Sequence, residues 1–156
     1  MKIYEVVEPT KKAAVVATIL ADLPAWFGLP ESTAAYVASA KELVCFVAEA
    51  EGEVLGFVTV AQPFAKVAEI NAMGVLAPAH RQGIGQSLMA AVLNWGRQAG
   101  IEYLQVKTLA DTHPDPNYAK TRRFYQSQGF VPLEIFPTLW GAENPCLQMI
   151  RGIKLN

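Results

Sequence analysis

The sequence predicts a mixed α/β fold in which a central mixed sheet of about seven strands is flanked by about four helices. Three observations support this prediction. Stretches in which apolar and polar residues alternate are interleaved with stretches whose apolar residues recur every three or four positions. Consecutive strand-like stretches between residues 43 and 76 are typical of antiparallel hairpins. From residue 67 to residue 109 a helix separates two strands, and this order predicts a parallel crossover.

The composition indicates one compact domain covering residues 1–156, with 52% hydrophobic and 17% charged residues. A net charge of −1 gives no general attraction to nucleic acid or to an anionic membrane, so neither is an expected partner. The N-terminus lacks a hydrophobic signal core, and we therefore expect a cytoplasmic protein. Cys45 and Cys146 are expected to be buried free thiols. His80 and His113 lack metal-ligand spacing, so no metal site is expected.

The first part of the chain is expected to form a strand over residues 2–7 and two helices, over residues 9–23 and 30–41. Each helix begins at a proline, which is favoured there because its missing N–H needs no partner in the first turn. The connection between the helices contains Trp26 and Phe27. These aromatic side chains either pack on the core or cover one side of a binding cleft.

Three strands should follow, over residues 43–50, 54–62 and 67–76. Glu51-Gly52 is expected to form the first hairpin turn, and Pro63 is expected to end the second strand. Regular alternation along the third strand would place two sets of side chains on opposite faces of the sheet: Glu69, Asn71, Met73 and Val75 against Ile70, Ala72, Gly74 and Leu76.

An amphipathic helix comes next, and its apolar stripe consists of residues spaced three and four apart: Ile84, Leu88, Ala91, Val92, Trp95 and Ala99. Gly100 is expected to end this helix. The rest of the chain predicts a strand over residues 103–109, a turn-rich loop, a helix over 118–128 ended by Gly129, and strands over 130–136 and 146–155.

The turn before the amphipathic helix has the properties of an anion site. Pro78 ends the preceding strand, and Gly83 and Gly85 leave space for a ligand to approach the backbone. The unpaired N–H groups of the first helical turn and the adjacent Arg81 suit a phosphate or pyrophosphate. The alternative is that both glycines merely allow a tight turn from strand to helix.

Two common phosphate motifs do not fit this turn. A dinucleotide fingerprint needs a small residue where Leu88 stands, and the P-loop needs a Gly-Lys-Ser/Thr sequence that is absent. The remaining pattern, Arg-Gln-Gly-Ile-Gly at 81–85 between a strand and a helix, resembles the pyrophosphate loop of the general N-acetyltransferase (GNAT) superfamily. His80 stands where that family usually has Gln or Arg.

A second stretch, Phe-Tyr-Gln-Ser-Gln-Gly-Phe at residues 124–130, is similar to the segment that closes many GNAT domains. The order of strands and helices is also the GNAT order, so the resemblance covers nearly the whole chain. It implies acetyl transfer from acetyl-CoA, without a metal, to a primary amine on a small molecule or peptide. It also allows a homodimer through the C-terminal strands.

The resemblance further implies individual roles. In the family a tyrosine hydroxyl reaches the sulfur of coenzyme A, and Tyr125 matches that position; some members carry a general base on an Ala-Glu-Ile segment, where this chain has Glu69. The residues expected to contact coenzyme A are Met73, Gly74, Val75, Arg81, Gln82, Gly83, Ile84, Gly85, Gln86, Asn117 and Tyr125.

Each of these assignments has an alternative. Tyr125 could be an ordinary core tyrosine, and Glu69 could be a solvated or ion-paired carboxylate. The domain as a whole could bind coenzyme A as a regulatory or sensor module without turnover. It could instead be an interaction module with Trp26 and Trp140 on a partner surface.

Overall fold

The computed structural model describes residues 1–154, and within them it contains a seven-stranded sheet and four α-helices. The strands are β1 (Lys2–Val6), β2 (Val44–Ala50), β3 (Glu53–Phe64), β4 (Val67–Val75), β5 (Tyr103–Leu109), β6 (Val131–Phe136) and β7 (Cys146–Gly152). The helices are α1 (Pro9–Ala21), α2 (Pro30–Ala40), α3 (Ile84–Ala99) and α4 (Pro116–Ser127), with a 3-10 turn at Ala77–Ala79. The predicted fold class is confirmed. The end of the predicted last strand, Leu155, lies outside the described residues.

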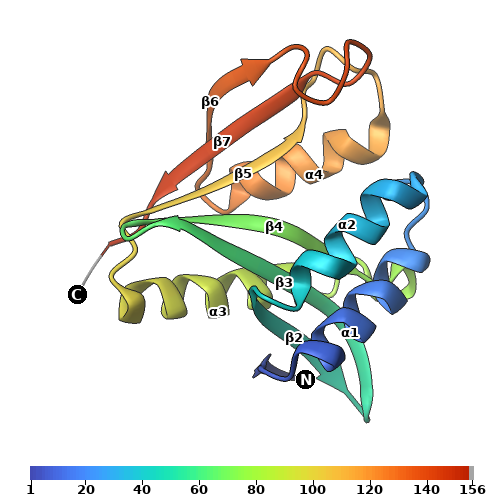
Figure 1. Cartoon of the computed structure of the whole chain (residues 1–156), viewed down its shortest axis with the longest axis vertical. Coiled ribbons are helices and arrows are strands. Elements are labelled where there is room, and N and C mark those ends of the chain that lie inside the picture. The colour runs from blue at the N-terminus through green and yellow to red at the C-terminus, as the bar shows by residue number, and fades with distance from the viewer. Residues whose placement is uncertain (155–156) are drawn as a thin grey trace.

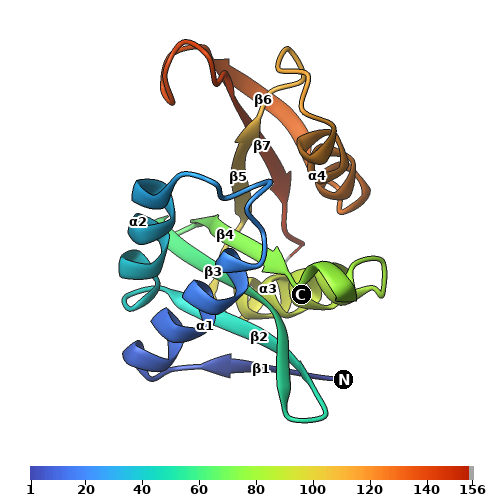
Figure 2. The ribbon, with the colours of Figure 1, turned by 90° about the vertical axis from the view of Figure 1, so that its right-hand side faces the viewer.

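The strands lie in the order β1-β2-β3-β4-β5-β7-β6. All neighbours are antiparallel except β4 and β5, whose parallel pairing joins Val67–Ile70 to Tyr103–Val106. The predicted crossover through α3 is therefore confirmed. Beyond Ile70 and Val106 the two strands separate, and Figure 2 shows β5, β6 and β7 leading away from the rest of the sheet. Within residues 1–154, no strand pairs with this edge of β4 along its C-terminal half.

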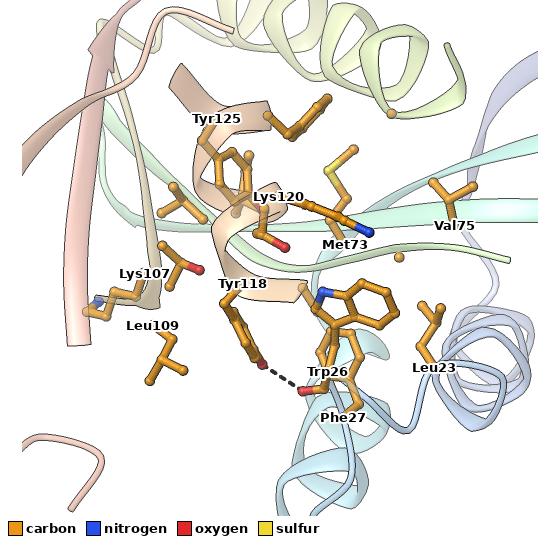
Figure 3. Close-up of a pocket in the computed structure, with 18 of the residues that line it drawn as sticks. Leu23, Trp26, Phe27, Met73, Val75, Lys107, Leu109, Tyr118, Lys120 and Tyr125 are labelled. Carbon is orange, nitrogen blue, oxygen red and sulfur yellow. Dashed lines mark hydrogen bonds between the residues drawn. The ribbon is translucent and has the colours of Figure 1, made fainter. Parts of the chain in front are cut away.

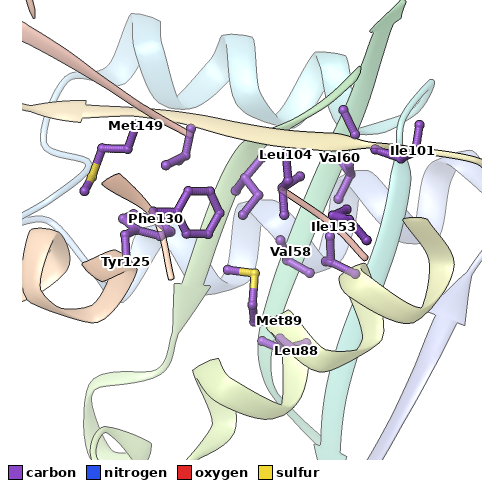
Figure 4. Close-up of a cluster of buried hydrophobic side chains, with 14 of the residues drawn as sticks. Val58, Val60, Leu88, Met89, Ile101, Leu104, Tyr125, Phe130, Met149 and Ile153 are labelled. Carbon is purple, nitrogen blue, oxygen red and sulfur yellow. The ribbon is translucent and has the colours of Figure 1, made fainter. Parts of the chain in front are cut away.

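Helices cover both faces of the sheet (Figures 1 and 2). One face packs on α1 and α2 around buried side chains that include Val16, Ile19 and Phe57. The other packs on α3 and α4, where the cluster in Figure 4 joins Leu88 and Met89 of α3 to strand residues and to Tyr125. Removal of these apolar side chains from water is the main force that holds both layers on the sheet.

Several local predictions are confirmed by backbone geometry. Glu51 and Gly52 have φ angles of 54° and 80°, as a two-residue hairpin turn requires. Gly100 and Gly129 have φ angles of 77° and 90°, which glycine adopts without the steric cost of a Cβ. Among residues 1–154, the helices lack the combination of length and apolarity needed to cross a bilayer.

Two predicted element details are wrong. Strand β3 continues through Pro63 to Phe64, because the register of β3 against β4 shifts between Ala61 and Phe64 and no regular ladder bond is required at the proline. In α3, Ala99 is exposed, whereas Met89 and Gly96 are buried. The helix therefore rests on a broader face than the predicted stripe.

The predicted alternation of β4 is also wrong, because Asn71 forms a β-bulge. Thr59 pairs with Ala72 and the next β3 residue, Val60, pairs with Ile70, so Asn71 is an extra residue without a partner. Ile70 consequently packs in the core under α3, whereas Ala72 packs in the core under α1.

The bulge divides the residues that were expected to share a face. The Asn71 amide donates to the Ser39 hydroxyl at the end of α2 (3.1 Å). Met73 and Val75, which should have pointed the same way, instead pack toward α3. The bulge thus directs the last side chains of β4, Met73 and Val75, toward α3, the helix that begins after the glycine-rich loop.

Candidate active site

A cavity of about 910 Å³ lies where β4 and β5 separate. Its lining comes from the α1–α2 connection, the end of β4, the start of α3, the end of β5 and α4. Figure 3 shows side chains from these elements converging on the same space. The volume is within the range of small-molecule and cofactor sites.

One end of the cavity is formed by the N-terminus of α3. Gly83, with a φ angle of 75°, is the N-cap, and no side chain among residues 1–154 caps the helix. By contrast, α1 and α4 are capped by the carboxylates of Glu8 and Asp115. The N–H groups at the start of α3 are therefore available to an external anion, and the helix dipole favours one.

The backbone before α3 is held in an unusual conformation. Arg81 has a φ angle of 66°, which costs a residue with a Cβ about 1–2 kcal/mol. The loop is tied to its surroundings by His80, whose Nε2–H donates to the Val75 carbonyl (2.7 Å), and by the Ala77 N–H, which donates to Asp22 (2.9 Å). These bonds fix the loop to both β4 and α1.

The two glycines of the loop have different tasks. A Cβ on Gly83 would meet open space, and its positive φ is the reason for glycine there. A Cβ on Gly85 would lie 3.1 Å from the ring of Phe124. The missing Cβ of Gly85 thus lets α3 pack against α4, and the approach of a ligand to the backbone of either glycine remains a prediction.

Tyr125 lies at the junction of the core and the cavity. Its ring is buried against Phe124 and Phe130, with ring centroids 5.4 and 5.5 Å away. Its side chain also lines the cavity (Figure 3). Burial raises the pKa of Tyr125 above its ordinary value, and the nearby Tyr36 and Tyr118 add to the shift. The hydroxyl is therefore protonated at neutral pH and can donate a hydrogen bond.

Tyr118 connects opposite walls of the cavity. Its hydroxyl donates to the backbone carbonyl of Trp26 (2.7 Å), as the dashed line in Figure 3 marks. Burial raises the pKa of Tyr118 to about 12, so this bond persists throughout the neutral range. The bond fixes the α1–α2 connection, in which Trp26 and Phe27 both line the cavity and pack on the core. Packing on the core is thus confirmed for both aromatics, and the binding of an acceptor in the cavity that they line remains a prediction.

Glu69 lies outside the cavity lining. Its carboxylate accepts hydrogen bonds from Lys107 Nζ (2.6 Å) and from Gln105 (3.2 Å) on the neighbouring strand. Figure 3 shows Lys107 extending away from the centre of the cavity. The structure thus places Glu69 in an ion pair, and its assignment as general base remains a prediction from the resemblance alone.

The cavity collects most of the residues that the sequence singled out: Met73, Gly74, Val75, Arg81, Gly83, Ile84, Gly85, Gln86 and Tyr125. It does not collect Gln82 or Asn117, and the N–H of Asn117 is occupied by the cap of α4. Sequence reasoning missed Tyr36, Lys107 and Thr108. The Thr108 hydroxyl is buried and has no hydrogen-bond partner within the described chain.

Residues 1–154 contain no group of three or more His, Cys, Asp or Glu side chains that could hold a metal ion. Cys45 and Cys146 are both buried and free, as predicted, and lie outside the lining of the cavity. Burial raises the pKa of the Cys45 thiol to about 11. Burial also raises the pKa of the Cys146 thiol, so both thiols are poor nucleophiles at neutral pH.

The sequence model of the acetyltransferase (GNAT) family matches residues 14–130 of this chain. A search of curated protein sequences finds no match.

Among solved structures, the chain is similar to an acetyltransferase assigned to the GNAT family from Desulfovibrio desulfuricans (TM-score 0.84, 18% identity, 98% of this chain and 99% of that one). It is also similar to an aminoglycoside 6'-N-acetyltransferase complexed with coenzyme A (0.78, 18%, 100% and 99%). A third is the ribosomal-protein-S18-alanine N-acetyltransferase from Escherichia coli (0.76, 19%, 99% and 96%). At these identities the structural likeness concerns the fold.

Proposed function

Because the chain belongs to the acetyltransferase (GNAT) family, we propose that it transfers an acetyl group from acetyl-CoA to a primary amine while both substrates are bound. The family consists of acetyl-CoA-dependent N-acetyltransferases. The observation that carries the proposal is the uncapped start of α3, beside Arg81, at one end of a cavity that continues to Tyr125.

The residues that line the cavity suit the two ends of acetyl-CoA. The N–H groups at the start of α3, together with Arg81, would hold the pyrophosphate. The unpaired edge of β4 at Met73–Val75 would hold the extended arm, because β5 leaves this edge after Ile70.

When bound, acetyl-CoA supplies a thioester whose carbonyl the amine can attack directly. Backbone N–H groups at the end of β4 can polarise that carbonyl and stabilise negative charge on its oxygen. Tyr125 can donate a hydrogen bond to the departing sulfur. Because its pKa is raised further above that of a thiol, we assign it hydrogen bonding rather than complete proton transfer.

Direct transfer also agrees with the positions of the cysteines. Neither Cys45 nor Cys146 lines the cavity, so the described residues offer no thiol for an acyl-enzyme intermediate.

The amine must also lose a proton during the transfer. The ion pair of Glu69 with Lys107 does not favour the Glu69 carboxylate as the acceptor of that proton. We therefore assign the proton to water.

The test is a thiol-release assay with acetyl-CoA and a panel of amines, with mass spectrometry of the products. Release that depends on the amine, together with an N-acetylated product, is the expected result. Binding of acetyl-CoA without turnover of any amine would contradict the proposal and favour a coenzyme A-dependent regulatory or sensor domain. The absence of both binding and turnover would favour an interaction module.

A further inference from the structure

We propose that the acceptor is a primary amine carried on one aromatic or large apolar group, without a second cationic centre. This inference rests on the proposed function and specifies its acceptor. Its basis is an aromatic wall of the cavity, together with a described lining whose charged residues are all cationic.

Aromatic side chains form this wall. Trp26 and Phe27 come from the α1–α2 connection, Tyr36 from α2, Tyr118 from α4 and Trp140 from the β6–β7 connection. The rings of Phe27 and Tyr36 are in edge contact, with centroids 5.8 Å apart. Such a wall provides apolar area for one ring or an alkyl group of similar size.

The aromatic wall adjoins the residue assigned to the departing sulfur. Tyr36, Tyr118 and Tyr125 all line the cavity, and Tyr118 and Tyr125 both belong to α4. All three tyrosines have raised pKa values and are uncharged at neutral pH. An amine held against this wall would therefore lie near the site of acetyl transfer, without an anionic phenolate beside it.

The charged residues in the lining are all cationic. Arg81, Lys107, Lys120 and Arg123 line the cavity, and in the part of the chain that the structure describes no Asp or Glu does so. Figure 3 shows Lys120 extending from α4 toward Met73, across the cavity. Because Lys107 is paired with Glu69 and Arg81 is assigned to the pyrophosphate, a second ammonium group on the acceptor would meet the like charge of Lys120 and would find no carboxylate in the described lining.

Three acidic side chains on the elements around the cavity already have partners. Glu69 is paired with Lys107, Asp22 accepts from the Ala77 N–H, and Asp115 caps α4. Polyamines and aminoglycosides carry several ammonium groups and would need such carboxylates. The lining therefore favours a single amine and disfavours a polycation.

The experiment compares matched pairs of amines in the thiol-release assay on the whole chain. Ethylamine and 2-phenylethylamine differ by one ring, and butylamine and 1,4-diaminobutane differ by one ammonium group. We expect the ring to raise kcat/KM by roughly 10- to 100-fold, which corresponds to burial of one phenyl side chain. We expect the second ammonium group to make kcat/KM lower for 1,4-diaminobutane than for butylamine. Kanamycin, spermidine and a tripeptide with N-terminal alanine complete the panel.

Substitutions in the aromatic wall test whether it causes the preference for 2-phenylethylamine. Phe27→Ala and Trp140→Ala should each reduce the advantage of 2-phenylethylamine by about 3- to 10-fold, the size of a single aromatic contact. Phe64→Ala is the matched control, because Phe64 is 75% exposed and lies outside the lining. Acetyl-CoA binding, measured by thermal shift, should be the same in all three variants and the wild type.

The outcomes separate this inference from the proposed function. Faster acetylation of 1,4-diaminobutane, spermidine, kanamycin or the tripeptide than of 2-phenylethylamine overturns the acceptor class and leaves acetyl transfer standing. Binding of acetyl-CoA without acetylation of any amine overturns both. Failure of the wild type to bind acetyl-CoA overturns the proposed function itself, and the acceptor assignment with it.

Discussion

Replacement of Tyr125 by phenylalanine removes one hydroxyl and keeps the ring that packs on Phe124 and Phe130. Within residues 1–154 the structure gives this hydroxyl no hydrogen-bond partner, so its loss leaves no buried group unsatisfied. The free energy of unfolding should therefore change little. If the hydroxyl bonds to sulfur as negative charge develops, its removal should cost about 1.5–3 kcal/mol of transition-state stabilisation, or roughly 10- to 150-fold in kcat.

Tyr118→Phe is the matched control, because it removes the same group from the same helix. There the hydroxyl donates to the Trp26 carbonyl, and its loss leaves that carbonyl without its partner. We expect a loss of about 1–3 kcal/mol in stability, seen as a lower melting temperature, with a much smaller change in kcat.

Steady-state kinetics with saturating acetyl-CoA, combined with thermal unfolding, would measure both effects. The reasoning is refuted if Tyr125→Phe retains the wild-type kcat. It is equally refuted if Tyr125→Phe loses as much stability as Tyr118→Phe, because the hydroxyl would then have a structural partner.

Three further predictions concern the proton, the ion pair and the loop. The value of kcat/KM should rise with pH toward the pKa of the amine, about 10 for an alkylamine, because the proton of the amine goes to water. The raised pKa of Tyr125 keeps its hydroxyl protonated over this range. A plateau that begins below pH 7 in the pH–rate profile would contradict this prediction. Glu69→Gln should lower kcat less than tenfold, since the carboxylate is paired with Lys107, whereas a loss of about 10²–10⁴ would identify a general base. Gly83→Ala should destabilise the protein by about 1–2 kcal/mol in urea unfolding because φ is positive, and Gly83→Asn by less; equal effects would show that the left-handed conformation is not the cause.

Much of the fold could be predicted because local signals determine it. Apolar spacing indicates each helix and strand, and a helix between two strands favours the parallel crossover that joins β4 to β5. Gly100 and Gly129 end their helices as expected. The bulge at Asn71 could not be predicted, because it depends on how β3 and β4 align rather than on the residues of β4 alone.

The candidate site likewise contains some residues that the sequence could predict and others that it could not. The start of α3 and Tyr125 belong to contiguous motifs, and the sequence alone indicates both. Tyr36 and Lys107 lie on elements far apart in the chain and reach the cavity only after folding. The ion pair of Glu69 is likewise a cross-strand contact, which no motif around residue 69 reveals.

The central claim is that the start of α3 and the unpaired edge of β4 form an acetyl-CoA site. The most direct measurement is the shift in melting temperature caused by acetyl-CoA, with NADH as nucleotide control, in the wild type, in Arg81→Glu and in the matched exposed control Lys41→Glu. At about a hundred times its dissociation constant, acetyl-CoA should stabilise the wild type by roughly 2.7 kcal/mol, or several degrees.

The account predicts this shift in the wild type and in Lys41→Glu, a much smaller shift in Arg81→Glu, and none with NADH. An equal shift in Arg81→Glu would place the ligand elsewhere. No shift with acetyl-CoA in a folded wild type would contradict the claim outright.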